Sequence, residues 1–252
     1  MSLKVDYSAT NARDIFLWLA AIATLLVLVY AIIHIFWPFL QWGPLSNLFD
    51  LDREVSIPSW YASMQLFVVG SLLFLASRNN QRRQHLPTSI LITGSLFFIF
   101  LSADEGAAIH EKITTLSINF GVNWLLFKGN HGAWIPVYSI LALSAVILAA
   151  RQFRKLWRHF RREIRIAMLG VIVFVTGGVG LEVVSYLFLR SGSNKGLYRV
   201  EVACEEYLEM IGVSIMLYAV LLLAAKISAK NPAPASTDLA EDFQPLDLKP
   251  CE

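Results

Sequence analysis

Hydrophobic residues run through this chain in six long stretches, each of which suits a membrane-spanning helix. A bilayer core about 30 Å thick needs roughly 20 apolar residues per helical span. The stretches that meet this standard are Ile15–Trp37, Trp60–Ser77, Ser89–Ser117, Trp134–Ala150, Ile166–Leu189 and Val200–Ala225. The pattern predicts an all-α protein: a polytopic bundle of six transmembrane helices occupying residues 15–225.

The composition agrees with a membrane protein and excludes several other classes. Hydrophobic residues make up 56% of the 252 residues and charged residues only 16%, whereas a soluble domain carries about 25% charged residues. Two cysteines exclude a disulfide scaffold. The net charge of +2 does not indicate a nucleic-acid partner. The expected partners are membrane lipids, with a homo-oligomer or a larger membrane complex left open.

The charges of the loops predict the orientation of the spans. Ten basic residues lie in the two loops 78–86 and 151–165, against five in the three loops on the other side. Because loops rich in Lys and Arg stay in the cytoplasm, both termini are expected there. Residues 1–14 then form a cytoplasmic N-terminus, and residues 226–252 form an acidic cytoplasmic tail that we expect to be disordered.

This topology gives a first prediction. Reporter fusions at Leu86 and at Asn123 should report opposite sides of the membrane, because one span separates the two loops. Finding both reporters on the same side would contradict the six-span arrangement.

The basic segment Arg151–Arg165 also has apolar residues at helical spacing. It is expected either to form an amphipathic helix that lies on anionic headgroups, or merely to prolong the fourth and fifth spans. In the first case the side chains that contact the headgroups are Arg154, Lys155, Arg158, Arg161 and Arg162.

Carboxylates inside the predicted spans are the most unusual feature of the sequence. Each one at mid-bilayer costs about 2.5–3.5 kcal/mol even on insertion scales. In the three spans that carry these acids, His110 and Lys112 are the only cationic residues that could neutralise them. The eight acids are Asp104, Glu105, Glu111, Glu182, Glu201, Glu205, Glu206 and Glu209.

Three different spans carry these acids to the same depth. Asp104 and Glu182 each lie about 16 residues along an outward-running span, or about 24 Å from its inner edge. Glu205 lies about 5 residues, roughly 8 Å, from the outer end of the inward-running sixth span. The third, fifth and sixth spans are therefore expected to form a polar pocket in the outer third of the membrane.

Carboxylates with one imidazole suit a hard or borderline divalent cation. The expected cofactor is Fe, Mn or Zn, with Ca less favoured. Asp104 and Glu206 are expected to orient the ligands or relay protons. Without a metal, the same carboxylates would be protonated. The expected ligands are Glu105, His110, Glu111, Glu182, Glu205 and Glu209.

The outer loop Phe49–Glu54 carries alternating acids, which could bind calcium. It lacks the glycine that turns an EF-hand loop. A solvated acidic loop is the favoured interpretation.

Three motifs together resemble a group of uncharacterised bacterial multi-pass membrane proteins, across most of the chain except the tail. They are Asp104-Glu105-x4-His110-Glu111, Phe49-Asp50-Leu51-Asp52-x-Glu54 with Pro58-x-Trp60, and Glu205-Glu206-x2-Glu209. The resemblance implies a bacterial inner-membrane location. It implies no activity.

Three functions remain open at this point. The first is a metal-dependent membrane enzyme acting on a lipid or another apolar substrate, and the second is a proton- or cation-coupled transporter or channel. The third is an accessory or scaffolding subunit of a membrane complex. The inner halves of two spans, Ile90–Leu101 and Ile166–Val175, carry few or no polar residues, which favours a site over a transport pathway.

Overall fold

The computed structural model describes residues 9–36, 43–81, 88–121, 134–185, 188 and 194–229, and within these it contains helices but no strand. An all-α fold is therefore confirmed for this part of the chain. Most of the predicted acidic tail, residues 230–252, lies outside the described residues. The helices are α1 (Ala9–Tyr30), η1 (Ala31–Phe36), α2 (Pro44–Leu48), α3 (Ile57–Gln81), α4 (Thr88–Ala107), α5 (Ile109–Asn119), α6 (Trp134–His159), α7 (Arg161–Val175), η3 (Thr176–Leu181), α8 (Glu182–Val184) and α9 (Lys195–Ala229).

Five helical segments are long and apolar enough to cross a membrane. They are Thr10–Phe36, Ile57–Arg78, Thr88–Ala107, Arg161–Val184 and Lys195–Ile227. A sixth span results only if both halves of α6, which meet at a bend of 63°, are counted together. The helices thus fit a membrane protein, while the number of six and the side of the termini stay predictions. The reporter positions Leu86 and Asn123 lie outside the described residues.

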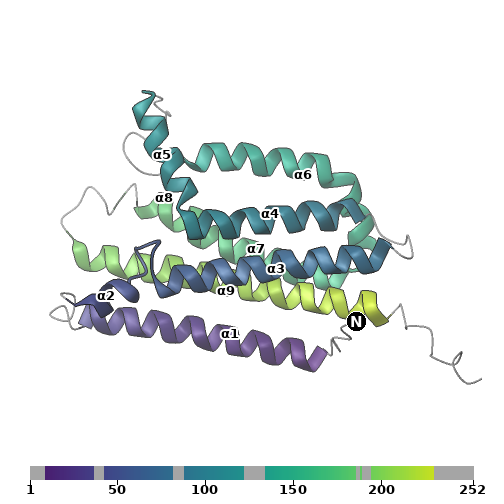
Figure 1. The fold of residues 1–252 in the computed structure, drawn as a ribbon, viewed down its shortest axis with the longest axis horizontal. Helices are drawn as coiled ribbons and strands as arrows, with labels where there is room; N and C mark the ends of the chain where they lie inside the picture. The colour runs from purple at the N-terminus through teal and green to yellow at the C-terminus, as the bar shows by residue number, and fades with distance from the viewer. Residues whose placement is uncertain are drawn as a thin grey trace, which may run out of the picture.

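The long helices lie side by side along the longest axis of the molecule (Figure 1). α9 is the central helix: it packs against α1, α3 and α7, and it is the most buried of the candidate spans. α3 packs closely on α4, and α6 lies at the edge of the bundle beside α4 (Figure 1). This arrangement brings one end of α9 next to the ends of α3 and α4.

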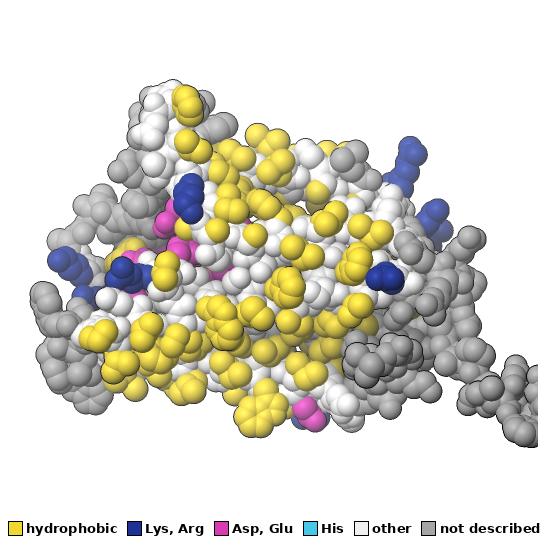
Figure 2. All heavy atoms as spheres, viewed as in Figure 1, with side chains coloured by type: hydrophobic (Ala, Val, Ile, Leu, Met, Phe, Trp, Pro, Cys, Tyr) yellow, Lys and Arg dark blue, Asp and Glu magenta, His cyan; other side chains and the backbone are white. Residues whose placement is uncertain are grey.

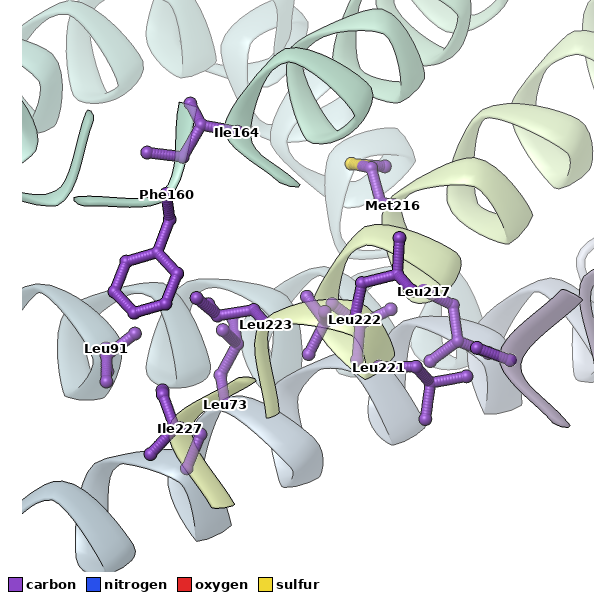
Figure 3. Packing of buried hydrophobic residues seen from close by; sticks show 14 of the residues in the cluster. Leu73, Leu91, Phe160, Ile164, Met216, Leu217, Leu221, Leu222, Leu223 and Ile227 are labelled. Carbon is purple, nitrogen blue, oxygen red and sulfur yellow. The ribbon is translucent and has the colours of Figure 1, made fainter. Parts of the chain in front are cut away.

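Apolar side chains from several helices form a core around the second half of α9. Phe160, which occupies the break between α6 and α7, points toward Leu91 of α4 and is only 2% exposed (Figure 3). Leu73 of α3 and Leu223 of α9 belong to the same cluster. The α6–α7 connection is therefore held by packing against three other helices.

The structure places the segment Arg151–Arg165 in two helices. α6 continues to His159, but its half Ala149–His159 is bent by 63° from the half Trp134–Ile147, and α7 begins at Arg161. Both expectations for this segment, a helix lying on headgroups and a prolongation of the two spans, stay predictions. Leu156, Phe160 and Ile164 are buried in the core, which keeps them away from lipid. Contact of the exposed basic side chains with headgroups stays a prediction for Arg154, Lys155, Arg158, Arg161 and Arg162.

Glycines allow α7 and η3 to approach α9 at backbone distance. A Cβ atom on Gly212 would lie 2.6 Å from the backbone nitrogen of Phe174, and one on Gly170 would lie 2.7 Å from the carbonyl oxygen of Gly212. A Cβ on Gly177 would lie 2.8 Å from the carbonyl oxygen of Glu205. Such small residues let membrane helices pack closely where lipid offers no hydrophobic driving force. The contact places the acidic part of α9 directly against η3.

Candidate acidic site

A break between α4 and α5 shapes the site. The single helix predicted over Ser89–Ser117 is wrong, because Ala108 adopts a positive φ of 52° and separates α4 from α5. A left-handed conformation in a residue other than glycine is unfavourable and needs support from its surroundings. Here the Asp104 carboxylate accepts a hydrogen bond of 2.8 Å from the backbone N–H of His110, in the first turn of α5. Asp104 thus satisfies a helix-terminal donor that has no partner within the helix.

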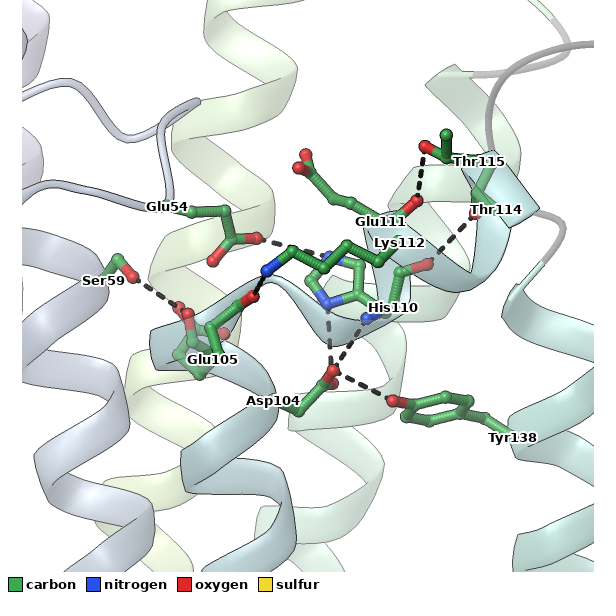
Figure 4. A network of polar contacts seen from close by, with 11 residues as sticks. Glu54, Ser59, Asp104, Glu105, His110, Glu111, Lys112, Thr114, Thr115 and Tyr138 are labelled. Atoms are coloured by element: carbon green, nitrogen blue, oxygen red, sulfur yellow. Dashed lines mark hydrogen bonds and ion pairs between the residues drawn. The ribbon is translucent and has the colours of Figure 1, made fainter. Parts of the chain in front are cut away.

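Asp104 is also the centre of a side-chain network (Figure 4). Its Oδ2 lies 3.4 Å from Nδ1 of His110, and its Oδ1 accepts a hydrogen bond of 2.9 Å from the hydroxyl of Tyr138 on α6. Asp104 itself is 7% exposed. One buried carboxylate therefore joins α4, α5 and α6.

Glu54 approaches His110 from the other side. Its Oε1 lies 3.3 Å from Nε2 of the imidazole, and both side chains are 23% exposed. The second oxygen, Oε2, is buried and has no hydrogen-bond partner among the described residues. The imidazole of His110 is therefore held between two carboxylates, with one nitrogen facing each (Figure 4).

Aromatic rings close the α6 side of the site. The ring of Trp134 packs edge-on against His110 at 5.5 Å and against Tyr138 at 5.3 Å. Tyr138 in turn lies 6.0 Å from Phe100 of α4. These contacts position the first turns of α6 against α4 and α5.

Three glutamates from α4 and α9 complete the group. Glu105 is half-buried, and its carbonyl oxygen accepts a hydrogen bond of 3.3 Å from Ser59 of α3. Glu206 and Glu209, one turn apart on α9, both lie within electrostatic range of Glu105 and Glu54. Figure 2 shows acidic side chains gathered on this face at one end of the bundle. We call the following group the acidic site: Glu54, Asp104, Glu105, His110, Glu206 and Glu209.

The remaining predicted residues lie around this group. Glu205 is within electrostatic range of Glu209 and Glu182, and Glu182 is buried on α8. Glu111 is exposed in the first turn of α5 and lies within electrostatic range of Glu54. The structure thus brings together Asp104, Glu105, His110, Glu206 and Glu209, with Glu205 and Glu182 behind Glu209.

Two participants were missed by the sequence analysis. Glu54 was assigned to a solvated loop, yet it contacts His110. Tyr138 was treated as part of an ordinary span, yet it donates to Asp104. The resemblance motif that includes Glu54 was the only sequence signal for either residue.

The predicted metal centre gains no support from the geometry. Within the described ranges, no group of three or more His, Cys, Asp or Glu side chains is arranged to hold a metal ion. Both nitrogens of His110 already face carboxylates, so the imidazole would have to release one of them to bind a metal. Metal binding by this set stays a prediction.

Burial and neighbouring charge raise the pKa values of both groups of the Glu54–His110 pair. Burial, followed by the charge of Glu105, raises the pKa of Glu54 from 4.5 to about 8; Glu111 and Asp104 add to this, while His110 opposes it. Burial lowers the pKa of His110, but Asp104, Glu54 and Glu105 outweigh it and raise that pKa from 6.5 to about 9. The folded protein thus holds both protons more tightly than the unfolded chain.

A pH dependence of stability follows from these two shifts. A group with a raised pKa stabilises the fold fully below its unfolded pKa, and this stabilisation is lost as the pH rises through the folded value. Glu54 gives a window from 4.5 to about 8 and His110 one from 6.5 to about 9, so thermal stability in detergent should fall most steeply between about 6.5 and 8. A Glu54→Gln variant should lose stability less steeply over this range. Stability that rises with pH across this window would contradict the raised pKa values of Glu54 and His110.

Comparison with known proteins identifies a family whose function is unknown. A family model described as a domain of unknown function (DUF8692) matches residues 17–225, which include every residue of the acidic site. No curated protein and no solved structure matches the chain.

Proposed function

This chain belongs to the family described as a domain of unknown function (DUF8692), and we propose that it is an integral membrane protein that binds a cation in exchange for protons at the acidic site. Such an exchange is the step on which a proton- or cation-coupled transporter depends. The observation that carries the proposal is the excess of carboxylates over cations in a half-buried position. The site holds five carboxylates and one imidazole, and two of the carboxylates contact the imidazole directly.

The electrostatics of the acidic site support this proposal. Carboxylates removed from water favour the neutral form unless a cation compensates their charge. Glu54 is an example of a carboxylate in the neutral form, because its pKa of about 8 keeps it largely protonated at neutral pH. A cation that enters the group should lower such pKa values and release protons. Proton binding and cation binding are therefore expected to compete.

Polar groups also continue from the acidic site into the bundle. One turn beyond Ser59 on α3, Ser63 donates a hydrogen bond of 2.8 Å to the carbonyl oxygen of Ser102 on α4. Deeper still, the amide of Gln65 donates to Tyr61 and Ser214 at 2.9 and 2.8 Å. The Oε1 atom of Gln65 is buried and has no hydrogen-bond partner among the described residues. These two hydrogen-bonded groups add polar side chains inside the bundle, which favours transport over the closed site expected from the sequence.

The metal-dependent enzyme is less well supported. A metal-dependent enzyme would need a set of ligands that converge on one ion, whereas both nitrogens of His110 already contact carboxylates, those of Asp104 and Glu54. A monovalent cation needs no such convergence, since carboxylates can bind it through hydrogen bonds or loose coordination. Divalent ions are therefore included in the test as competitors.

The test measures cation binding and proton release together. Protein purified in a nonionic detergent is titrated with methylammonium, Na⁺, Mn²⁺, Zn²⁺ or Ca²⁺ in weak buffer, while a pH indicator and thermal unfolding are followed. At a concentration 100 times the Kd, a bound cation should stabilise the fold by about 2.7 kcal/mol and release protons. A Glu209→Gln variant should lose both effects, and Asp14→Asn, an exposed position on α1, should keep them.

Each outcome of this titration is informative. Stabilisation by one or more cations with proton release supports the proposal. Stabilisation by Mn²⁺ or Zn²⁺ alone, lost in His110→Ala, would replace it by the metal-dependent enzyme. No effect of any cation would leave the carboxylates as a structural element of an accessory subunit.

A further inference from the structure

The middle of α6 is detached from the bundle. All nine residues 139–147 are exposed, although a helix packed on one side buries a residue every three or four positions. Both ends of α6 are anchored: Ile135 is 7% exposed at one end and Leu156 is 8% exposed at the other. A space about 13 Å long, the length of nine helical residues, is therefore left along α6.

The face of α4 beside this space is also uncovered. Leu96, Phe97 and Phe100 are 63%, 44% and 40% exposed, and their spacing of three to four residues places them on one face of α4. This face is turned toward α6, because Phe100 packs on Tyr138. One turn beyond Phe100 on the same face lies Asp104.

Small residues face this stripe from α6. Ala142 and Ala145 follow Tyr138 at spacings of four and seven residues, so they continue the side of α6 that contacts Asp104 and Phe100. Both alanines are exposed, which means that no described residue covers this side. We call the space lined by Leu96, Phe97, Phe100, Ala142 and Ala145 the α4–α6 groove. Figure 2 shows hydrophobic side chains over α4 and α6 adjoining the acidic side chains.

The groove is apolar along its length and polar at one end. The hydroxyl of Ser144 donates to the carbonyl oxygen of Ile140 in its own helix. The polar end consists of the Tyr138–Asp104 hydrogen bond and the carboxylates of the acidic site. Ligand sites combine an apolar lining with a few polar groups that orient the ligand in this way.

We propose that the α4–α6 groove binds the alkyl chain of a single-chain amphipathic amine, whose ammonium group enters the acidic site. The negative charge of the acidic site selects a cation, and the apolar groove, about 13 Å long, receives the alkyl chain. This inference rests on the proposed function, since it names the class of cation that the acidic site receives. The ammonium group takes the place of a proton among the carboxylates, and the chain reaches the groove from the lipid.

The experiment uses a photoactivatable dodecylamine that carries a diazirine at the end of its chain. Full-length protein in nonionic detergent is irradiated with this probe, with the matching alcohol or with the matching sulfate, and cross-linked peptides are mapped by mass spectrometry. The amine should label residues 93–100 and 139–147 at least tenfold more than the alcohol or the sulfate. Unlabelled dodecylamine should compete for this labelling.

Matched variants separate the groove from the surrounding detergent. Ala142→Trp fills the groove and should reduce labelling about tenfold, whereas Ile140→Trp adds the same bulk on the opposite face of α6 and should not. Asp104→Asn removes the negative charge beside the groove and should reduce the preference for the amine. Methylammonium stabilisation and proton release are measured in parallel on every variant.

The outcomes distinguish this inference from the proposed function. Equal labelling by all three probes, or labelling of α1 as strong as that of the groove, would show that the probe reacts from the detergent and not from a bound position. Either result would overturn the inference. If methylammonium still releases protons in that case, the acidic site stands and the groove alone is rejected. If neither amine binds, the inference is overturned, and the proposed function is then decided by the response to Na⁺ and the divalent cations.

Discussion

Replacing Gly212 by alanine should destabilise the bundle by about 3 kcal/mol, at the upper end of the range for overpacked interiors. The added Cβ would lie 2.6 Å from the backbone nitrogen of Phe174 and 2.8 Å from its Cα. Neither atom belongs to a flexible side chain, so α7 and α9 would have to move apart. Thermal unfolding of the purified variant in the same detergent as the wild type measures this effect.

Gly180→Ala is the matched control for this substitution. A Cβ at Gly180 would meet its nearest neighbours at 3.8 and 3.9 Å, which is ordinary contact, and alanine favours a helix over glycine by up to about 1 kcal/mol. The control should be neutral or slightly stabilising. Equal effects of the two variants would show that α7 and α9 do not meet at Gly212.

Replacing Asp104 by alanine should have the second large effect, a loss of about 3 kcal/mol in stability, as expected when one partner of a buried ion pair is removed. The substitution leaves the backbone N–H of His110 and the hydroxyl of Tyr138 without their acceptor. It also leaves the imidazole facing Glu54 alone. Unfolding temperatures in detergent at pH 7 measure the loss.

Two further variants give this prediction its controls. Glu111→Ala removes an exposed carboxylate of the same segment, and its effect should stay within about 0.5 kcal/mol. Asp104→Asn keeps an acceptor oxygen but removes the charge that does most to raise the pKa of His110. Its stability should therefore be intermediate, and the loss of stability with rising pH should end below pH 9. If Asp104→Ala behaves like Glu111→Ala, the network around Asp104 does not form.

The sequence was sufficient to predict the class of the fold. In a bilayer every backbone polar group has to be satisfied within its own segment, so a long apolar run predicts a helix with few alternatives. Five runs appear as candidate spans, and α6 supplies the remaining run with a bend of 63°. The bend and the detached middle of α6 carry no strong hydropathy signal, because apolar residues suit lipid and protein surroundings equally.

The sequence also singled out most of the acidic site. Carboxylates are rare within apolar runs because inserting them into a membrane is costly. The sequence alone therefore predicted Asp104, Glu206 and Glu209 as residues of the site. Helical periodicity then failed beyond Ala108, because it assumes an unbroken helix. The positive φ at Ala108 redirects His110 back onto Asp104 and turns Glu111 outward.

Only the tertiary structure decided which charges meet. Glu54 lies in a polar loop, where a carboxylate costs nothing, so its sequence context gives no reason to place it beside His110. Its position depends on contacts between segments far apart in the chain, such as the hydrogen bond of 2.7 Å from Tyr198 to Asp52 in the same loop. Hydropathy is a local property of each residue and determines the spans, whereas the pairing of charges is a long-range property that depends on how those spans pack.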